Sequence, residues 1–249
     1  MKIGFCFLVK ENISKENLWR NFLKSANIDD YSVYIHSKSS HVPSSLKNVV
    51  VDPHPIETAW ASISLVHATK RLLETAFNDD CDSVIFLSGD SLPLWNFQTI
   101  QQLCSRTLFS LQPKQDLYPF QIKMNQREFE RIRTFYNLEK TVQLVKQNMF
   151  FSLSKLDYNA VKNVQIEKFP CQEVPDEYFW ANQLIMSGIS VQNSNYIYVN
   201  DDPTKTQSLS WVLDEEIIHN ARSRGCLFIR KVNGFSSDFA RQYYKSLIA

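Results

Sequence analysis

Continuous apolar runs alternate with segments of helical periodicity through the first 107 residues of the chain. The apolar runs have few polar positions, which is typical of strands that are buried on both faces. They predict strands at 2–9, 31–37, 48–53 and 82–90. The intervening segments place apolar residues on one helical face, which predicts amphipathic helices at 15–26 and 57–77 and a further helix near 97–106.

The second half of the chain has a less regular pattern. Residues 108–148 are polar and partly helical, and we expect them to include a loop that binds a ligand. Apolar runs then predict strands at 149–154, 195–201 and 226–232. Helical patterns predict helices at 155–163, 175–187, 213–223 and 235–247. Pro175 suits the first turn of its helix, and Gly188 suits the end of the same helix.

This strand–helix rhythm predicts an α/β fold with a mostly parallel central sheet and helices on both faces. A length of 249 residues suits a single domain, 1–249. Ligands of such sheets bind at the carboxyl ends of the strands. Those ends are predicted at Val9-Lys10-Glu11, His36-Ser37-Lys38 and Ser88-Gly89-Asp90.

Charge and hydropathy narrow the functional class. The formal net charge is +1, and this balance argues against a nucleic-acid partner. The apolar stretch at the N-terminus is too short for a membrane-spanning helix, so we expect no membrane segment in this chain and a cytoplasmic or soluble protein, with a bacterial or viral origin left open. A location in the Golgi lumen stays open if an anchor has been removed.

The five cysteines do not form a metal-binding pattern. Their number is odd and no CxxC is present, so zinc is not expected and reduced thiols are the default. Cys171 and Cys226 could form a disulfide in an oxidising compartment.

The first candidate for chemistry is the segment PDEYFWA at 175–181. It places two carboxyl groups, Asp176 and Glu177, in the first turn of a predicted helix. Acidic residues there often cap the helix and complement its dipole, which is one interpretation. The aromatic residues that follow favour the other interpretation, a walled active site.

The chain resembles the core-2/I-branching β-1,6-N-acetylglucosaminyltransferases, a family with a similar PDE-x-x-WA segment. Other segments that are similar to the family, in the same order, are IHSKSS (35–40), AWASISLVHATKRLLETAF (59–77), LSGDSLPL (87–94), MFFSLSKLDYNAV (149–161) and LFIRKV (227–232). The resemblance implies a GT-A fold with a nucleotide-binding half, 1–107, and an acceptor-binding and catalytic half, 108–249.

The resemblance also implies an activity, inverting transfer from a UDP-sugar, UDP-GlcNAc or a related one, to a glycan hydroxyl. Glu177 takes the role of the catalytic base, which removes the proton of the attacking hydroxyl. Asp176 would cap the helix or position Glu177 beside the acceptor. Tyr196 and Tyr198 correspond to an aromatic pair that contacts the acceptor sugar, with ordinary core packing as the alternative.

The family resemblance assigns Lys231 to the diphosphate of the donor. A fixed cation can stabilise the charge of the leaving diphosphate as a metal would. Where the family has a second basic residue this chain has Gln207, and Lys205 is the nearest cation. The letters Asp80-Cys81-Asp82 match a DxD metal motif but precede the strand, and Asp201-Asp202 reads as a turn, so we expect no metal and no cofactor besides the donor.

The resemblance places the nucleoside of the donor at the ends of the first two strands, beside Val9, Lys10, His36 and Ser37. His36 has a packing role as its alternative. Asp90 either binds hydroxyls of the donor sugar or serves as a turn residue.

Two tryptophans in the similar segments, Trp60 and Trp180, are expected to pack in the core. The chain departs from the family at Lys38, at Gln207 and at Lys146-Gln147, where the family has a Gly-Ser pair. These departures leave a glycan-binding domain without turnover open as an alternative. A second alternative is a metal-dependent GT-A transferase that uses Asp90 or another acidic site.

Overall fold

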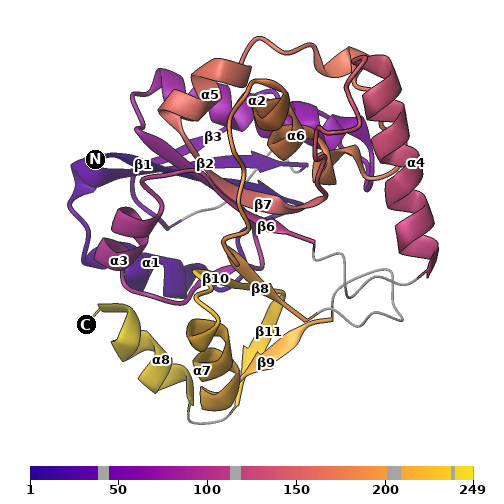
Figure 1. The fold of residues 1–249 in the computed structure, drawn as a ribbon. Helices are drawn as coiled ribbons and strands as arrows, with labels where there is room; N and C mark the ends of the chain where they lie inside the picture. The colour runs from indigo at the N-terminus through magenta and orange to yellow at the C-terminus, as the bar shows by residue number, and fades with distance from the viewer. Residues whose placement is uncertain (39–44, 113–118, 201–208, 237–238, 249) are drawn as a thin grey trace.

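A computed structural model describes residues 1–38, 45–112, 119–200, 209–236 and 239–248. Its centre is a six-stranded sheet in the order β3-β2-β1-β4-β7-β6 (Figure 1). The strands are β1 (Ile3–Val9), β2 (Tyr31–Ser37), β3 (Val49–Val51), β4 (Ser83–Ser88), β6 (Leu108–Leu111) and β7 (Gln147–Ser154). The first four are mutually parallel, whereas β7 is antiparallel to both β4 and β6. The predicted α/β fold with a mostly parallel sheet is confirmed.

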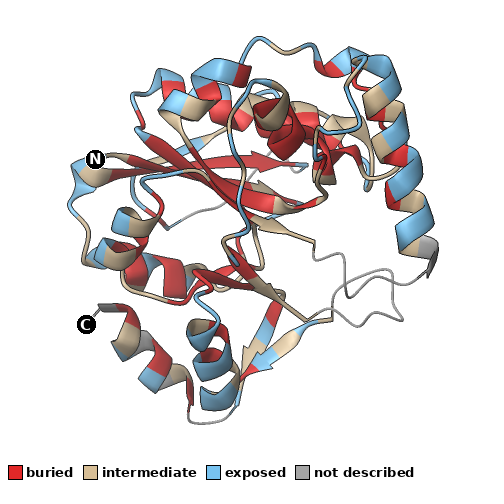
Figure 2. Cartoon of the chain, in the orientation of Figure 1, coloured by how far each residue is buried: buried red, intermediate tan, exposed pale blue. Residues whose placement is uncertain are grey.

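Helices cover both faces of this sheet (Figure 1). One layer consists of α2 (Ile63–Asn78), α5 (Lys155–Val161) and α6 (Phe179–Met186), and the other contains α1 (Glu16–Lys24) and α3 (Phe97–Leu103). Alternate residues of β1 contact opposite layers. The ring of Phe7 lies 4.9 Å from that of Trp19 in α1, whereas the Cys6 thiol lies 3.7 Å from the Leu72 carbonyl in α2. Because both faces are covered, the central strands are buried throughout (Figure 2).

Short polar side chains fix the points at which several helices begin. Asn96 accepts a hydrogen bond from the Thr99 amide at 2.9 Å, and Asp214 accepts one from the Ile217 amide at 2.8 Å. Each bond satisfies an amide that the first helical turn leaves without an intrahelical partner.

The C-terminal part of the chain adds smaller sheets beside the α1–α3 layer (Figure 1). Strand β10 (Phe228–Arg230) pairs with β5 (Leu92–Pro93) and β8 (Ile197–Val199), and β11 (Val232–Phe235) pairs with β9 (Trp211–Leu213). The remaining elements are α4 (Pro119–Phe135), α7 (Glu215–Ser223), α8 (Phe239–Ile248) and 3₁₀ turns at Ile28–Asp30, Ile166–Lys168 and Pro175–Glu177.

Three predicted elements differ from the structure. The polar region 108–148, which was expected to be partly helical, contains the 17-residue helix α4, and it also contains strand β6, which its weak periodicity did not predict. The run 226–232 is divided between β10 and β11, which belong to different sheets. The helix predicted over 175–187 is a 3₁₀ turn followed by α6, because Tyr178 between them has a φ of −122°.

The predicted helix 57–77 begins six residues late, at Ile63, where Ser62 is the N-cap. Residues before it form a loop in which Ala61 has a φ of +57°. Trp60 lies on this loop and is 71% exposed, so its expected packing role is wrong. Trp180 is 1% exposed and does pack in the core, as expected.

Gly89 allows the loop after β1 to approach the turn after β4. Its carbonyl accepts a hydrogen bond from the Ser14 amide at 2.7 Å. A Cβ at this position would lie 2.7 Å from the Asn12 carbonyl oxygen and 2.8 Å from Cγ1 of Val9. Two carboxyl ends of the sheet are therefore in direct contact only because residue 89 has no side chain.

Gly89→Ala is expected to destabilise the protein by about 1–3 kcal/mol, because backbone must move to admit the methyl group. The loss corresponds to a fall in Tm of roughly 2–4 °C per kcal/mol for a chain of this size. Gly234→Ala is the matched control, since a Cβ there meets nothing within 4 Å. Equal melting temperatures for the two variants in calorimetry would contradict this account of the turn.

Candidate active site

The segment Pro175-Asp176-Glu177 forms a single 3₁₀ turn that packs against α2 and β7. Val174 enters it with a left-handed backbone, φ +43°, and the Glu177 amide donates to the Val174 carbonyl at 2.8 Å. The turn closes when the Tyr178 amide donates to the Pro175 carbonyl at 3.1 Å. This turn gives the two adjacent carboxyl groups different surroundings.

Glu177 has the more open of the two carboxyl groups. Its side chain is 33% exposed, and Oε2 lies 2.9 Å from Nζ of Lys146. The Lys146 side chain is only 11% exposed, and its ammonium lies 5.7 Å from the centroid of the Tyr178 ring. A carboxylate that is open on one side and paired with a cation on the other can accept a proton from a bound hydroxyl.

Asp176 is 7% exposed, and its Oδ1 has no hydrogen-bond partner. Burial, followed by the charge of Glu177, raises the pKa of the Asp176 carboxyl to about 7. The alternative in which Asp176 caps the helix is wrong, because α6 has no side-chain cap and Asp176 lies inside the preceding turn. A role in positioning Glu177 stays a prediction.

The segment that carries Lys146 is attached to α6 by hydrogen bonds on both sides of the lysine. The Val145 amide donates to Asn182 Oδ1 at 2.9 Å, and Nδ2 of Asn182 donates back to the Val145 carbonyl at 2.7 Å. The side-chain oxygen of Gln147 accepts from the Ala181 amide at 2.5 Å. These hydrogen bonds fix the backbone position of Lys146 beside the turn that carries Glu177.

A second polar cluster lies where β4 and β10 end. Nε of Arg230 lies 3.2 Å from Oγ of Ser88 and 3.7 Å from Oδ1 of Asp90, and its guanidinium lies 4.5 Å from the centroid of the Phe150 ring. The Val232 amide donates to the Asp90 carbonyl at 3.0 Å. These contacts hold the neighbouring residue, the half-buried Lys231, beside the turn that contains Asp90.

Strand β7 connects the two clusters. Lys146 directly precedes the strand and contacts Glu177, and Phe150 lies within the strand under Arg230. Four residues of extended chain place the Cα atoms of Lys146 and Phe150 roughly 13 Å apart. The Glu177–Lys146 pair and the Arg230 contacts therefore lie at separate points along the same strand.

The predicted nucleoside residues lie at the ends of β1 and β2. The Ser37 hydroxyl donates to the carbonyls of Lys10 and Glu11, at 3.2 and 3.3 Å, which joins the two strand ends. His36 is fully buried, its Nε2 accepts from the Ile56 amide at 2.9 Å, and its burial lowers its pKa. This bond fits the packing alternative for His36, while Val9 and Lys10 remain predicted contacts of the nucleoside.

The two tyrosines predicted to contact the acceptor differ in burial. Tyr196 is 0% exposed, and its ring lies 5.3 Å from that of Phe228, which favours the packing alternative. Tyr198 is half-buried and stacks on Trp211 at 5.4 Å, with the Arg224 guanidinium 5.4 Å from its ring centroid. We retain Tyr198 as the member of the pair that can contact a sugar.

Several sequence expectations lie outside this region. Lys205, Gln207 and the pair Asp201-Asp202 fall outside the described residues. All five cysteines are buried and unpaired, so the bridge between Cys171 and Cys226 is not formed.

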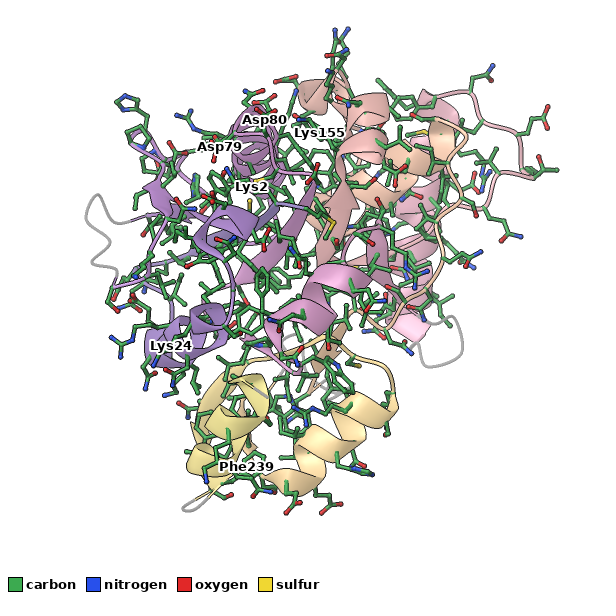
Figure 3. All side chains as sticks on the ribbon, turned by 90° about the vertical axis from the view of Figure 1, so that its left-hand side faces the viewer. Lys2, Lys24, Asp79, Asp80, Lys155 and Phe239 are labelled. Atoms are coloured by element: carbon green, nitrogen blue, oxygen red, sulfur yellow. The ribbon has the colours of Figure 1, made fainter. Side chains whose placement is uncertain are left out.

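The DxD-like letters directly precede β4 and so lie at its amino end, and Figure 3 shows Asp80 near Lys155. Asp80 pairs with Lys155 at 3.1 Å, and Asp82 accepts from the Lys2 amide at 2.8 Å. Both carboxylates therefore have partners within the chain, at the edge of the sheet opposite to that of Asp90. Within the described ranges, no group of three or more His, Cys, Asp or Glu is arranged to hold a metal ion.

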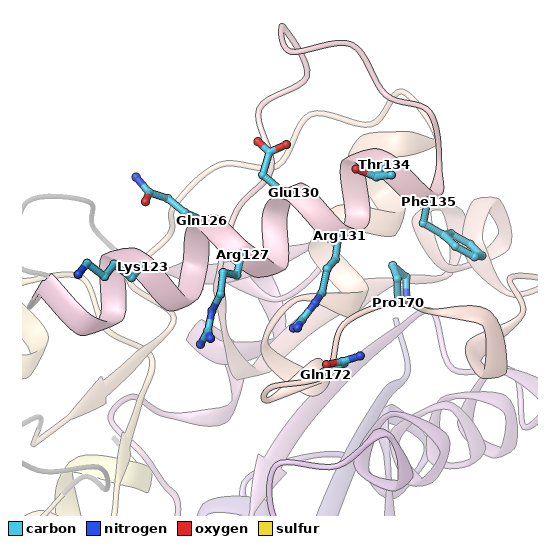
Figure 4. Close-up of a pocket in the computed structure, with 9 residues that line it drawn as sticks. All are labelled: Lys123, Gln126, Arg127, Glu130, Arg131, Thr134, Phe135, Pro170 and Gln172. Carbon is cyan, nitrogen blue, oxygen red and sulfur yellow. The ribbon is translucent and has the colours of Figure 1, made fainter.

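A cavity of about 1090 Å³ opens along α4 and the loop at 170–172 (Figure 4). Its basic residues include Arg127, which pairs with Glu173 at 2.8 Å, and Arg131, which pairs with the fully buried Glu128. Since partners within the chain neutralise these cations and no predicted site residue lines the cavity, we do not assign it to catalysis.

Two residues of the site were missed as functional candidates. Lys146 was noticed only as a departure from the family pattern, and Arg230 only as a letter beside Lys231. The sequence has no pattern that pairs Lys146 with Glu177, 31 residues away. Only the contact in the structure shows this pairing. For Arg230, the signal in the sequence was the pair of adjacent basic residues, Arg230 and Lys231.

A mostly parallel sheet with an open carboxylate and a basic side chain at its carboxyl edge has its polar groups where ligands of such sheets bind. The sequence model of the Core-2/I-Branching enzymes matches residues 3–200, and the chain belongs to that family. It is therefore a glycosyltransferase, and its sheet is that of the expected GT-A fold.

Solved structures with a similar arrangement include galactosyltransferase LgtC in complex with donor and acceptor sugar analogs, at 14% identity and a TM-score of 0.38. An active-site mutant of LgtC has 14% identity and a TM-score of 0.36. Each match covers 80% of this chain and 75% of the other. The chain has no significant match among curated protein sequences. No helix in the described part of the chain is long and apolar enough to cross a membrane.

The buried carboxyl group of Asp176 makes stability depend on pH. Its pKa of about 7 lies above that of an unfolded Asp, so the folded state binds the extra proton between about pH 4 and pH 7. Its contribution to stability is therefore present at low pH and is lost as pH rises through 7, with a slope of at most about 1.4 kcal/mol per pH unit.

Asp176→Asn removes this titration and is expected to flatten the fall in stability between pH 5 and pH 7. The measurement is the free energy of unfolding in urea at pH 5, 6 and 7 for both proteins. If the two curves run parallel, Asp176 does not hold a proton in the folded protein.

Proposed function

We propose that the protein is an inverting glycosyltransferase that moves GlcNAc or a related sugar from a UDP-sugar to a glycan hydroxyl, without a metal and with Glu177 as the base. The observation that supports it most is the difference between the two adjacent carboxyl groups. Glu177 is open and paired with Lys146 at 2.9 Å, whereas Asp176 is buried. One carboxylate is thereby presented to an acceptor, as inversion requires.

The reaction needs a single displacement. The acceptor hydroxyl gives its proton to Glu177 while its oxygen attacks the anomeric carbon from the side opposite the diphosphate. The bond between the anomeric carbon and the phosphate oxygen breaks, and its electron pair leaves with the nucleoside diphosphate. The β7 spacing of roughly 13 Å supports this division into an acceptor end and a leaving-group end.

Cations serve the leaving-group end. Lys231 is proposed to bind the diphosphate, with Lys205 as a second contact, and Arg230 holds Asp90 toward the donor sugar through the ion pair at 3.7 Å. Fixed cations stabilise the charge that develops on the departing phosphate. The nucleoside is proposed to lie in the first half of the chain, 1–107, beside Val9, Lys10, His36 and Ser37.

Glu177→Gln is expected to lower kcat by about 10²–10⁴-fold, since the amide cannot accept the acceptor proton. Donor binding should persist, which a rise in Tm with UDP-GlcNAc and related UDP-sugars would show. Glu173→Gln is the matched control, because Glu173 pairs with Arg127 on α4 instead of facing the site. Turnover near the wild-type rate in Glu177→Gln would remove Glu177 from the role of base.

Transfer is expected to continue in excess chelator. The Asp90 carboxylate has the Arg230 guanidinium beside it, at 3.7 Å. A fixed cation therefore already lies beside the carboxylate that would otherwise bind a metal. The measurement is the initial rate with and without EDTA, followed by addition of Mn²⁺. Complete loss of activity that Mn²⁺ restores would favour the metal-dependent alternative.

The glycan-binding alternative without turnover is separated by a different assay. Release of UDP from the donor in the absence of acceptor shows an intact transferase centre. A protein that binds glycans but releases no UDP with any acceptor or donor tested would support that alternative.

A further inference from the structure

Lys146 is nearly buried and forms an ion pair with an open carboxylate. Its side chain is 11% exposed, while that of Glu177 is 33% exposed. Removing an ammonium group from water is costly unless a carboxylate compensates for it. Lys146 therefore differs from a solvated surface lysine, because its ammonium is nearly buried and depends on the Glu177 carboxylate for compensation.

The backbone around Lys146 is fixed before any substrate binds. Its neighbours Val145 and Gln147 are hydrogen-bonded to Asn182 and to the Ala181 amide in α6. Its own carbonyl accepts from the Gln112 amide at 2.8 Å. Since α6 directly follows the turn that carries Glu177, the ammonium and the carboxylate belong to one rigid unit.

We propose that Lys146 is a positioning residue for transfer, which holds Oε2 of Glu177 so that the other carboxylate oxygen faces the acceptor hydroxyl. It also decides which of two adjacent carboxyl groups carries the negative charge. This inference rests on the proposed role of Glu177 as the base.

The charge distribution follows from the geometry. One ammonium lies beside two adjacent carboxyl groups, and it contacts Glu177 directly. The buried Asp176, whose Oδ1 has no partner, is then the group that holds a proton. The ammonium of Lys146 lies beside the Glu177 carboxylate and balances its negative charge, and that carboxylate is the proposed acceptor of the hydroxyl proton.

The same contact helps to reset the site after transfer. When Glu177 has taken the acceptor proton, it is neutral and Lys146 is a nearly buried cation without a charged partner. This imbalance favours release of the proton from Glu177 to water. The ion pair then forms again, and no other reactant is consumed.

The test compares Lys146→Met with Lys146→Arg in the full-length protein. Lys146→Met should lower kcat about 10- to 100-fold, as loss of a charge-assisted hydrogen bond does, and leave the KM for donor nearly unchanged. The acid limb of kcat/KM should move to higher pH, because the cation that lies beside the carboxylate is gone. Lys146→Arg should restore most of the rate and the position of the limb.

Lys140→Met is the matched control, because Lys140 is an exposed lysine on the same segment. It should keep the wild-type rate and pH profile. If Lys146→Met does not fold, Lys146→Gln takes its place, since the amide can still donate to Glu177 but carries no charge. The same shift of the acid limb is expected for that variant.

A folded Lys146→Met or Lys146→Gln whose acid limb coincides with that of the wild type would overturn the inference, whether or not its rate falls. Failure of the proposed function gives a different result, because Glu177→Gln would then remain active. An inactive Glu177→Gln together with an unshifted Lys146 variant removes only the role of Lys146.

Discussion

The candidate active site depends on the hydrogen bonds that attach the start of β7 to α6. Asn182 binds both backbone groups of Val145, and Gln147 binds the Ala181 amide, so Lys146 between them meets Glu177 at 2.9 Å. A charged pair of this kind is stable in a partly buried site only when its geometry is held by the surrounding structure. The packing of two elements that are distant in sequence thus brings the ammonium and the carboxylate together.

The opposite end of the site has the same dependence on close packing. Gly89 lets the turn after β4 touch the loop after β1, and the cation cluster of Arg230 and Lys231 reaches this turn from β10. Strand β7 connects the two ends of the site, since Lys146 directly precedes it and Phe150 within it contacts Arg230. The central sheet therefore sets the distance between the proposed base and the proposed leaving-group contacts.

Much of this architecture could be predicted because buried parallel strands leave a strong local pattern. The apolar runs that form β1, β2 and β4 are apolar on both faces. The predicted alternation of these strands with helices along the chain is confirmed. The bounds of helix α4 within the partly helical region 108–148 were not predicted, and the loop before α2 was predicted as helix. Their positions depend on contacts with other elements, and Trp60, apolar by type, lies exposed on that loop.

The sequence by itself determined the α/β class, the family and the candidate carboxylate, since each depends on residues close together in the chain or on a series of short motifs. It did not determine which of Asp176 and Glu177 is open, or that Lys146 is the partner. Tertiary structure decided those points, because burial and ion pairing depend on which distant segments enclose a side chain. A local pattern contains no information about that enclosure.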